Sequence, residues 1–489
     1  MASYRIICFS VLVFCRNFRD FQCFPSLQSW CPGEGLNLHP ENQDQPLIKK
    51  ALNIAEKMPK YCFFFDTGTG KTISALEVIK QKQCKGLIVA PLSTLKTVWE
   101  DSIDEFYPDM KYINLYPFNK PKREAFIRND NSVHIINPDG FKIHFETIMK
   151  ANYKCLILDE SSCLKGRTTK IAKTLIKFGQ SIESSYLLSG TPAPNTKMEF
   201  FPQLYLIAPG LLGFNFYSFR NRYFHPVDRN GYKWVENSSM QEDFIERLQK
   251  YCLFVKKSDV LDLPERTYEV REVIMSTEQS KIYKQMKKEF VAEIKGETIM
   301  SPNVLSKIMK LRQITSGFVY YNDSTLKISD RKIKALHEVL EEIGNNQVII
   351  WANFKAEIKE LLKNIPNSVA IYGDIANQTL KDNNLSMFKQ GQYQYLIANP
   401  ASLAHGVTIV NASYAIYYSL SYSNEQWQQS QDRIYRYGQK NKCTYIILNC
   451  KDTIDEVLYR TLQRKEKDYK EVLEYLKGGK QDEILESSK

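Results

Sequence analysis

The sequence predicts an α/β protein with two units, each a parallel sheet with helices on both faces, and a helical insertion between them. Short apolar runs recur between helical stretches, without the alternation of polar residues that a half-exposed strand shows. Such runs are typical of strands buried on both faces. They form two series along the chain, so the same kind of unit is expected twice.

The candidate strands of the first series are residues 61–65, 86–90, 133–136, 155–158 and 185–188. Those of the second series are residues 348–351, 369–372, 395–398, 414–418 and 445–448. Residues 195 to 330, between the two series, are expected to be largely helical. In parallel sheets ligands bind beyond the carboxyl ends of the strands, and the polar motifs described below lie at such ends.

The segment after the first candidate strand has the order of a phosphate-binding loop. It reads Asp66-Thr67-Gly68-Thr69-Gly70-Lys71-Thr72 and leads into a helical pattern. Backbone N–H groups and the positive helix end would face the anion, and Gly68 and Gly70 allow close approach. Lys71 is expected to reach the β- and γ-phosphates of a nucleotide, and Thr72 to hold Mg²⁺. The strict pattern has glycine where this chain has Phe65, and a chance Gly-Lys-Thr is the alternative.

An acidic pair, Asp159 and Glu160, directly follows the apolar run 155–158. Adjacent acids are common on surfaces, but after a buried strand and together with a phosphate loop they fit a nucleotide-hydrolysing site. Asp159 is expected to hold Mg²⁺, and Glu160 to orient or deprotonate the attacking water.

Two arginines near the end of the second series are candidates for contact with phosphate. Residues 432–436 are expected to form a helix that Gly438 ends, so Arg433 and Arg436 would share one face. They could project toward a γ-phosphate and stabilise its charge as arginine fingers do. The alternative is a pair of surface salt bridges.

Composition and charge describe a globular protein with a moderately basic balance. The chain has 489 residues, 43% of them hydrophobic, and a formal net charge of +11, which suits a polyanionic partner such as nucleic acid. The cysteines form neither a C-x-x-C pair nor a zinc-type cluster, which indicates a reducing, cytoplasmic setting. Residues 6–15 are apolar but too short to span a bilayer. No Ala-x-Ala-like cleavage site follows this run, so residues 1–35 are predicted to be an accessory or poorly specified extension.

Together these segments resemble the Swi/Snf-type ATPases of helicase superfamily two, in a compact form such as bacteria and phages carry. The segments that match family motifs are residues 66–72 (motif I), 90–93 (Ia), 159–162 (II), 188–192 with Asn195 (III) and 429–439 (VI). Leu263-Pro264 and residues 452–456 also resemble family segments. Ser161 and Ser162 stand where the family usually has Ala-His, and His405 replaces a common glycine of motif V.

The resemblance implies two RecA-like lobes that use ATP and Mg²⁺ and act on duplex DNA. The residues expected to contact nucleic acid or to couple the lobes are Pro91, Ser93, Ser189, Gly190, Thr191, Asn195, Gln429 and Gln439. Gly406 of motif V is expected near the nucleotide. Gln43 or Gln45 could touch the adenine edge, although a lone glutamine before a helix is more often a surface residue. Plain turn formation is the alternative for Pro91 and Thr191.

The motif positions divide the chain into five parts. These are an extension (1–35), an ATP-binding lobe with a helical insertion (36–262), a helical connector (263–330), a C-terminal lobe (331–475) and a charged tail (476–489).

Three functions remain open from the sequence. The leading hypothesis is DNA-stimulated ATP hydrolysis that drives translocation along, or remodelling of, duplex DNA without obligatory strand separation. The second is an RNA-stimulated helicase of the same superfamily. The third is a nucleotide-gated DNA-binding scaffold without productive turnover, which Phe65, Ser162 and His405 motivate. The intact Lys71 and Asp159 argue against the scaffold.

Overall fold

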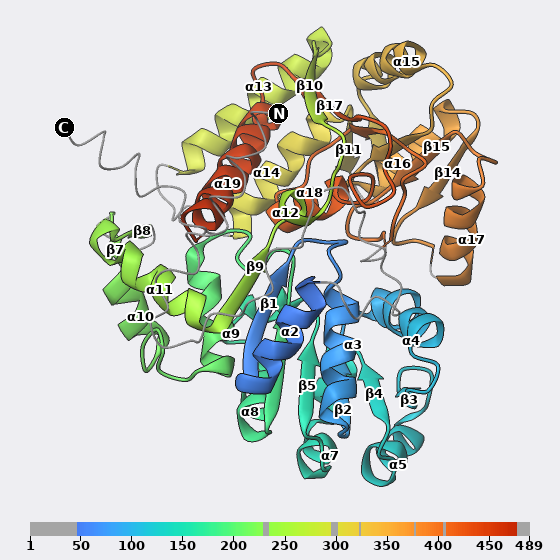
Figure 1. Ribbon diagram of the computed structural model, residues 1–489. Coiled ribbons are helices and arrows are strands. Elements are labelled where there is room, and N and C mark those ends of the chain that lie inside the picture. Colours follow the sequence, from blue (N-terminus) through green and yellow to red (C-terminus); the bar gives the residue numbers. More distant parts are fainter. Residues whose placement is uncertain are drawn as a thin grey trace, which may run out of the picture. The chain divides into compact units, whose positions relative to one another are not determined.

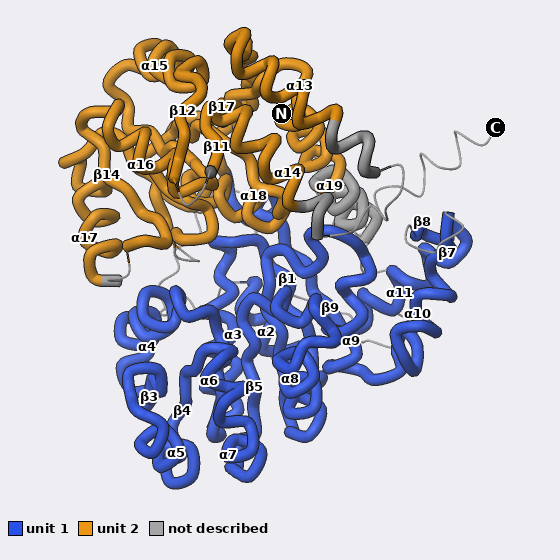
Figure 2. The backbone as a smooth tube through the Cα atoms, turned by 180° about the vertical axis from the view of Figure 1, so that it is seen from behind, with its two compact units in different colours: residues 1–262, 466–489 blue, residues 263–465 orange. Residues whose placement is uncertain are grey.

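The computed structural model describes residues 46–227, 234–294, 302–321, 324–375, 378–403 and 407–476. The chain divides into two compact units, coloured separately in Figure 2: unit 1 is Met1–Asp262 with Glu466–Lys489, and unit 2 is Leu263–Lys465. The predicted extension 1–35 lies outside the described residues, and the five-part division of the chain stays a prediction.

The described part of unit 1 contains a seven-stranded sheet in which every neighbouring pair of strands is parallel. In spatial order the strands are β3 (Tyr112–Asn114), β4 (Val133–Ile136), β2 (Gly86–Val89), β5 (Cys155–Leu158), β6 (Ser184–Leu188), β1 (Lys60–Phe65) and β9 (Cys252–Val255). The helices are α2 (Pro46–Lys57), α3 (Lys71–Lys82), α4 (Asp101–Phe106), α5 (Lys120–Asn129), α6 (Pro138–Ile143), α7 (Phe145–Lys150), α8 (Lys170–Ser181), α9 (Phe200–Ile207), α10 (Phe216–Tyr223), α11 (Gln241–Tyr251) and α12 (Lys257–Val260).

Strand β1 shows why an uninterrupted apolar run is needed here. Successive side chains of a strand point to opposite faces. Tyr61, Phe63 and Phe65 enter a core shared with α2 and α3, which lie in front of the sheet in Figure 1. Cys62 and Phe64 enter a second core shared with α8, α9 and α11. Both faces of the sheet are therefore covered, as predicted.

The described part of unit 2 contains a six-stranded sheet, also with parallel pairs throughout. Its strands in spatial order are β10 (Arg266–Val273), β17 (Cys443–Cys450), β16 (Tyr414–Tyr417), β13 (Val348–Trp351), β15 (Tyr395–Ala398) and β14 (Ser368–Ile371). The helices are α13 (Thr277–Ile294), α14 (Pro302–Thr315), α15 (Arg331–Ile343), α16 (Lys355–Asn364), α17 (Gln378–Lys389), α18 (Asn424–Gln431) and α19 (Ile454–Leu476), the last of which begins in this unit. Separate cores on the two faces of the sheet confirm the predicted architecture.

The expectation of a largely helical stretch over residues 195–330 is incomplete. This stretch contains the helices α9 to α14, but it also supplies the edge strands β9 and β10 of the two sheets. Two antiparallel hairpins lie there as well, β7 (Phe224–Pro226) with β8 (Trp234–Glu236) and β11 (Phe318–Tyr321) with β12 (Ser324–Lys327). Strand β10 is only partly buried and carries charged residues, so it lacks the apolar run by which the other strands are recognised.

A buried ion pair fixes the start of α19 in unit 2. Lys332 Nζ lies 2.9 Å from Asp455 Oδ2, and Thr315 Oγ1 donates to Asp455 Oδ1 at 2.9 Å. Burial alone would lower the pKa of Lys332, but the nearby Asp455 carboxylate raises it above its ordinary value. Removing one partner of such a pair leaves an uncompensated buried charge.

We therefore expect Asp455→Ala to lower the free energy of unfolding by about 3 kcal/mol or more. Urea unfolding followed by circular dichroism measures this change. Asp330→Ala is the matched control, because Asp330, the residue before α15, forms a solvent-exposed pair with Lys334 and makes no side-chain capping hydrogen bond. It should leave the unfolding midpoint unchanged. Equal midpoints for both variants would contradict a structural role for the buried pair.

Among the described residues, no helix combines the length and the apolar character that crossing a lipid bilayer demands.

Candidate functional site

The predicted motifs of unit 1 lie together at the carboxyl ends of neighbouring strands of its sheet. Strands β5, β6 and β1 are neighbours and parallel, so their carboxyl ends lie side by side. The acidic pair follows β5, the segment from Ser189 follows β6, and the glycine-containing loop follows β1. The sheet order thus brings together three segments that lie far apart in the sequence.

The loop between β1 and α3 has the backbone shape that its glycines permit. Gly68 and Gly70 adopt φ angles of 82° and 92°, in the left-handed region that other residues avoid. Thr69 Oγ1 donates to the carbonyl oxygen of Asp66 at 2.8 Å, and Asp66 Oδ2 accepts from the backbone N–H of Lys257 at 3.0 Å. Helix α3 then begins at Lys71. The predicted order of strand, turn and helix is confirmed, while the ligand roles of these residues remain predictions.

The side-chain amino group of Lys71 is buried at these strand ends. Its Nζ is shielded from solvent and has no hydrogen-bond partner among the described residues. A Cβ atom at Gly190 would lie 3.2 Å from this Nζ and 3.4 Å from the carbonyl oxygen of Phe65, so the absence of a side chain at Gly190 leaves room for the lysine. Buried polar groups are almost always paired. An anionic ligand such as a phosphate group would supply the missing partner.

Asp159 is held by one hydrogen bond on each carboxylate oxygen. The indole Nε1 of Trp99 donates to Oδ2 at 3.0 Å, and the backbone N–H of Glu160 donates to Oδ1 at 3.0 Å. Burial, and then the neighbouring Glu160 charge, raise the pKa of Asp159 to about 6, whereas Lys71 and the indole oppose this rise. A buried carboxylate beside another acid fits a divalent cation, which favours its charged form. With Thr72 at the start of α3, Asp159 could therefore hold Mg²⁺.

Glu160 lies where the chain leaves β5 and bends sharply. Its φ angle of 49° is in the left-handed region, which is uncommon for a residue with a side chain. Ser189 Oγ donates to its Oε2 at 3.5 Å, which ties the end of β6 to that of β5. Such local strain is often found at functional sites. The geometry is compatible with the predicted role of Glu160 toward water.

The residues predicted to contact nucleic acid lie at or just beyond the ends of β2 and β6. Ser189 Oγ accepts from the backbone N–H of Thr191 at 3.1 Å, and Thr191 Oγ1 is buried without a partner among the described residues. Asn195 donates from its side chain to Glu199 at 3.0 Å. Pro91 and Ser93 lie in a 3₁₀ turn, where their carbonyl oxygens accept local hydrogen bonds. Contacts of these residues, and of Gly190 between them, with nucleic acid remain predictions.

Two further residues of this site were missed by sequence reasoning. One is Trp99, described above. The other is Gln203 of α9, which accepts from Ser161 Oγ at 2.6 Å and donates to the carbonyl oxygen of Pro192 at 2.6 Å. It thereby joins the segments that follow β5 and β6. A single glutamine in the apolar helix α9 was an available signal, whereas nothing around Trp99 marked it.

The predicted helix over residues 432–436 is wrong. Helix α18 ends at Gln431, and Arg433 and Arg436 lie in the turns that follow. The carbonyl oxygen of Arg433 accepts from the backbone N–H of Ile409 at 2.8 Å and is thereby used outside a helix. Both guanidinium groups nevertheless converge, because each donates from Nη1 to the carbonyl oxygen of Val407 at 3.4 Å.

The two glutamines of this segment are both buried. Gln439 Nε2 donates to the carbonyl oxygens of Val410, Ala412 and Ile434 at 3.3, 2.9 and 3.1 Å, which gives Gln439 a role in holding the turns. Gln429 Nε2 is buried without a partner among the described residues. The remaining site predictions, Gln45 and Gly406, lie outside the described residues, as does His405.

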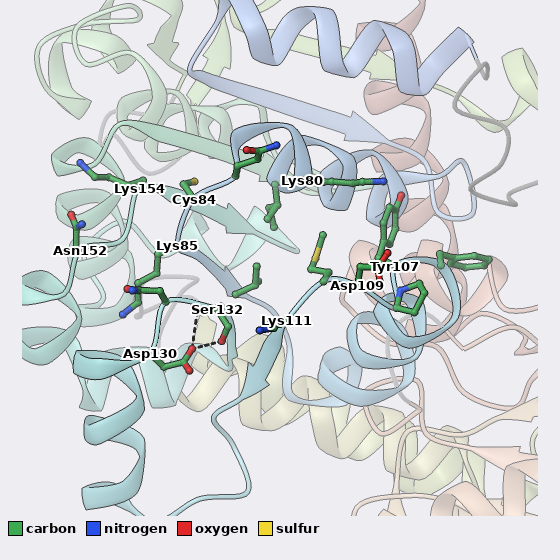
Figure 3. A pocket seen from close by; sticks show the side chains of 17 residues that line it. Lys80, Cys84, Lys85, Tyr107, Asp109, Lys111, Asp130, Ser132, Asn152 and Lys154 are labelled. Carbon is green, nitrogen blue, oxygen red and sulfur yellow. Dashed lines mark hydrogen bonds between the residues drawn. The ribbon is translucent and has the colours of Figure 1, made fainter.

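A pocket of about 820 Å³ lies at the opposite, amino-terminal ends of strands of the same sheet (Figure 3). Lys85, Lys111, Ser132 and Lys154, which line it, directly precede the strands β2, β3, β4 and β5. It therefore lies at the amino ends of the strands, away from Lys71 and the acidic pair. This pocket is not the predicted phosphate site.

Comparison with known protein families identifies the chain. Residues 54–317 match the SNF2-related domain, and residues 331–438 match the helicase conserved C-terminal domain. The first match alone spans more than half of the sequence. The chain belongs to the SNF2-related family. It is an ATPase, its two parallel-sheet units are RecA-like lobes, and the resemblance predicted from the motifs is confirmed.

Several curated proteins are similar along most of the chain. Protein p41 of Acyrthosiphon pisum secondary endosymbiont phage 1 is 27% identical, over 80% of this chain and 89% of p41. YwqA of Bacillus subtilis, named as an ATP-dependent helicase/translocase, is 24% identical over 83% of this chain and 45% of YwqA. The SWI/SNF-related matrix-associated actin-dependent regulator of chromatin subfamily A-like protein 1 of Xenopus laevis is 23% identical over 82% and 41%. The chain thus spans less than half the length of the last two.

Proposed function

We propose that this SNF2-family ATPase hydrolyses ATP under stimulation by DNA, and that hydrolysis drives movement along, or remodelling of, duplex DNA without obligatory strand separation. The observation that carries the proposal is that the glycine-containing loop before Lys71 and the acidic pair lie together at the carboxyl ends of β1 and β5. The chain also matches both the SNF2-related and the helicase C-terminal families. YwqA, a relative, is named as a helicase/translocase.

The proposed roles at the nucleotide follow from the chemistry of each side chain. Residues 66–72 bind the phosphates through backbone N–H groups, with Lys71 on the β- and γ-phosphates. Thr72 and Asp159 hold Mg²⁺, which when bound neutralises charge on the phosphate oxygens. Glu160 orients the attacking water, and Arg433 and Arg436 stabilise the charge that develops on the γ-phosphate.

The proposed DNA contacts are sequence-independent. The net charge of +11 favours a polyanion. Pro91 and Ser93 after β2, and the segment from Ser189 to Asn195 after β6, are proposed to contact phosphates or to couple such contacts to hydrolysis. Gln429 and Gln439 are proposed to act in coupling. Because its substrates would be ATP and DNA, we also propose that the protein acts inside cells.

Displacement of a triplex-forming strand tests movement without requiring unwinding. The purified protein is expected to displace a third strand from duplex DNA with ATP but not with a non-hydrolysable analogue. A duplex with a single-stranded fork should stay paired under the same conditions. ATP hydrolysis without displacement of the third strand would contradict the proposed translocation.

The choice of duplex DNA over RNA has its own test. ATPase rates are measured with duplex DNA, single-stranded DNA and RNA at equal nucleotide concentration and equal salt, because phosphate contacts weaken steeply with salt. The proposal expects the largest stimulation with duplex DNA. Stronger stimulation by RNA would favour the RNA-stimulated helicase instead.

A further inference from the structure

Trp99, which carries no charge, donates a hydrogen bond to the Asp159 carboxylate. Trp99 is fully buried, and its Nε1–H donates to Asp159 Oδ2 at 3.0 Å. An indole offers a single donor and no acceptor, and a buried indole N–H usually finds a partner. Here that partner is a charged side chain at the end of β5 and not a backbone carbonyl.

The position of Trp99 in the chain is itself unusual. It lies in a π-helical segment, Leu95–Glu100, between the 3₁₀ turn that contains Ser93 and the start of α4. Such π-helical turns are rare and occur often at functional sites. Leu95 and Ile103 pack in the same core as Trp99, so the indole ring is fixed by its surroundings.

The two hydrogen bonds that Asp159 accepts restrict rotation of its carboxylate group. Oδ1 accepts from the backbone N–H of Glu160 and Oδ2 from the indole of Trp99. A carboxylate has about four lone-pair positions, so two remain for a metal ion or its water ligands. Without the indole, one oxygen would lose its only side-chain donor and the carboxylate could rotate about its bond to Cβ.

We propose that Trp99 is a positioning residue that fixes the Asp159 carboxylate in the orientation that binds Mg²⁺ with ATP. This inference rests on the proposed function, in which Asp159 holds Mg²⁺. It adds a residue with no charge and no contact with the nucleotide, whose effect passes through Asp159. Partners that orient metal ligands commonly change metal affinity about tenfold to 100-fold when they are removed.

The test uses the full-length protein with the substitution Trp99→Phe, which keeps an aromatic ring and removes the N–H. Binding of a fluorescent ATP analogue is measured in EDTA and across a Mg²⁺ titration. We expect the Mg²⁺ concentration for half-maximal effect to rise about tenfold, with affinity in EDTA unchanged. A merely structural change would alter both affinities.

Trp351→Phe is the matched control. Trp351 is also fully buried, but its Nε1 has no hydrogen-bond partner among the described residues. This control should keep the wild-type Mg²⁺ titration. If Trp99→Phe does not fold, benzothienylalanine at position 99 replaces the N–H by sulfur in nearly the same shape.

Two results separate the failure of the inference from that of the proposed function. A folded variant at position 99 with the wild-type Mg²⁺ titration would overturn the inference alone. A wild-type protein whose nucleotide binding does not respond to Mg²⁺ would contradict the proposed role of Asp159 itself, and the inference would fall with it.

Discussion

Replacing Lys71 with alanine is expected to abolish ATP hydrolysis while unit 1 stays folded. The Lys71 Nζ is buried with no hydrogen-bond partner among the described residues, so its removal breaks no hydrogen bond of the fold. It does remove the one side-chain cation that the loop would offer to the β- and γ-phosphates. Loss of a preorganised electrostatic contact of this kind lowers kcat by about 100-fold to 1000-fold.

Steady-state phosphate release with saturating DNA measures the effect, and thermal unfolding checks the fold. We expect a melting temperature close to that of the wild type, because the Lys71 Nζ makes no hydrogen bond among the described residues. Lys82→Ala is the matched control: Lys82 lies at the other end of α3, where its Nζ donates to the carbonyl oxygen of Ala55 at 3.0 Å. Near-normal hydrolysis by the Lys71 variant would exclude the proposed phosphate loop.

Much of the site around Lys71 could be predicted from the sequence, because the sequence patterns that mark it are local. A strand buried on both faces needs an uninterrupted apolar run, and 155–158 and 61–65 provide it. Gly68 and Gly70 mark a turn that other residues would strain. The polar residues that follow such runs must then lie at the carboxyl ends of strands.

The features that could not be predicted from the sequence depend on contacts between segments that lie far apart in the chain. Trp99 and Asp159 meet because β2 and β5 are neighbours, and no local pattern records that pairing. Strand β10 was missed because it is a partly exposed edge strand with charged side chains. The end of α18 was misplaced because a hydrogen bond between Ile409 and Arg433 outcompetes a further helical turn.

Arg433 and Arg436 follow the end of α18, so they do not share the helix face that the sequence predicts. They lie together because both donate to the carbonyl oxygen of Val407. A charged phosphate oxygen is a stronger acceptor for a guanidinium group than the neutral carbonyl oxygen of Val407, which accepts from both arginines at 3.4 Å.

Arg436→Ala is therefore expected to reduce kcat for ATP hydrolysis by about 1000-fold or more, the range measured for arginine fingers. Affinity for ATP should change far less, because the guanidinium acts on charge that develops in the transition state. Single-turnover hydrolysis and equilibrium binding of a fluorescent ATP analogue separate these two quantities. Arg460→Ala, which removes an exposed guanidinium group that contacts Glu456, is the control.

A fall in ATP affinity that matches the fall in kcat/KM, with kcat unchanged, would show that Arg436 binds the ground state and is no arginine finger. Unfolding is the other outcome to separate, because burial lowers the pKa of Arg436 and its guanidinium is part of a packed turn. Arg436→Lys addresses this point. It keeps a positive charge and most of the side-chain volume, but it lacks the planar fork that contacts two phosphate oxygens at once. If the lysine variant folds but hydrolyses ATP as slowly as the alanine variant, the acceleration of hydrolysis depends on the guanidinium group itself.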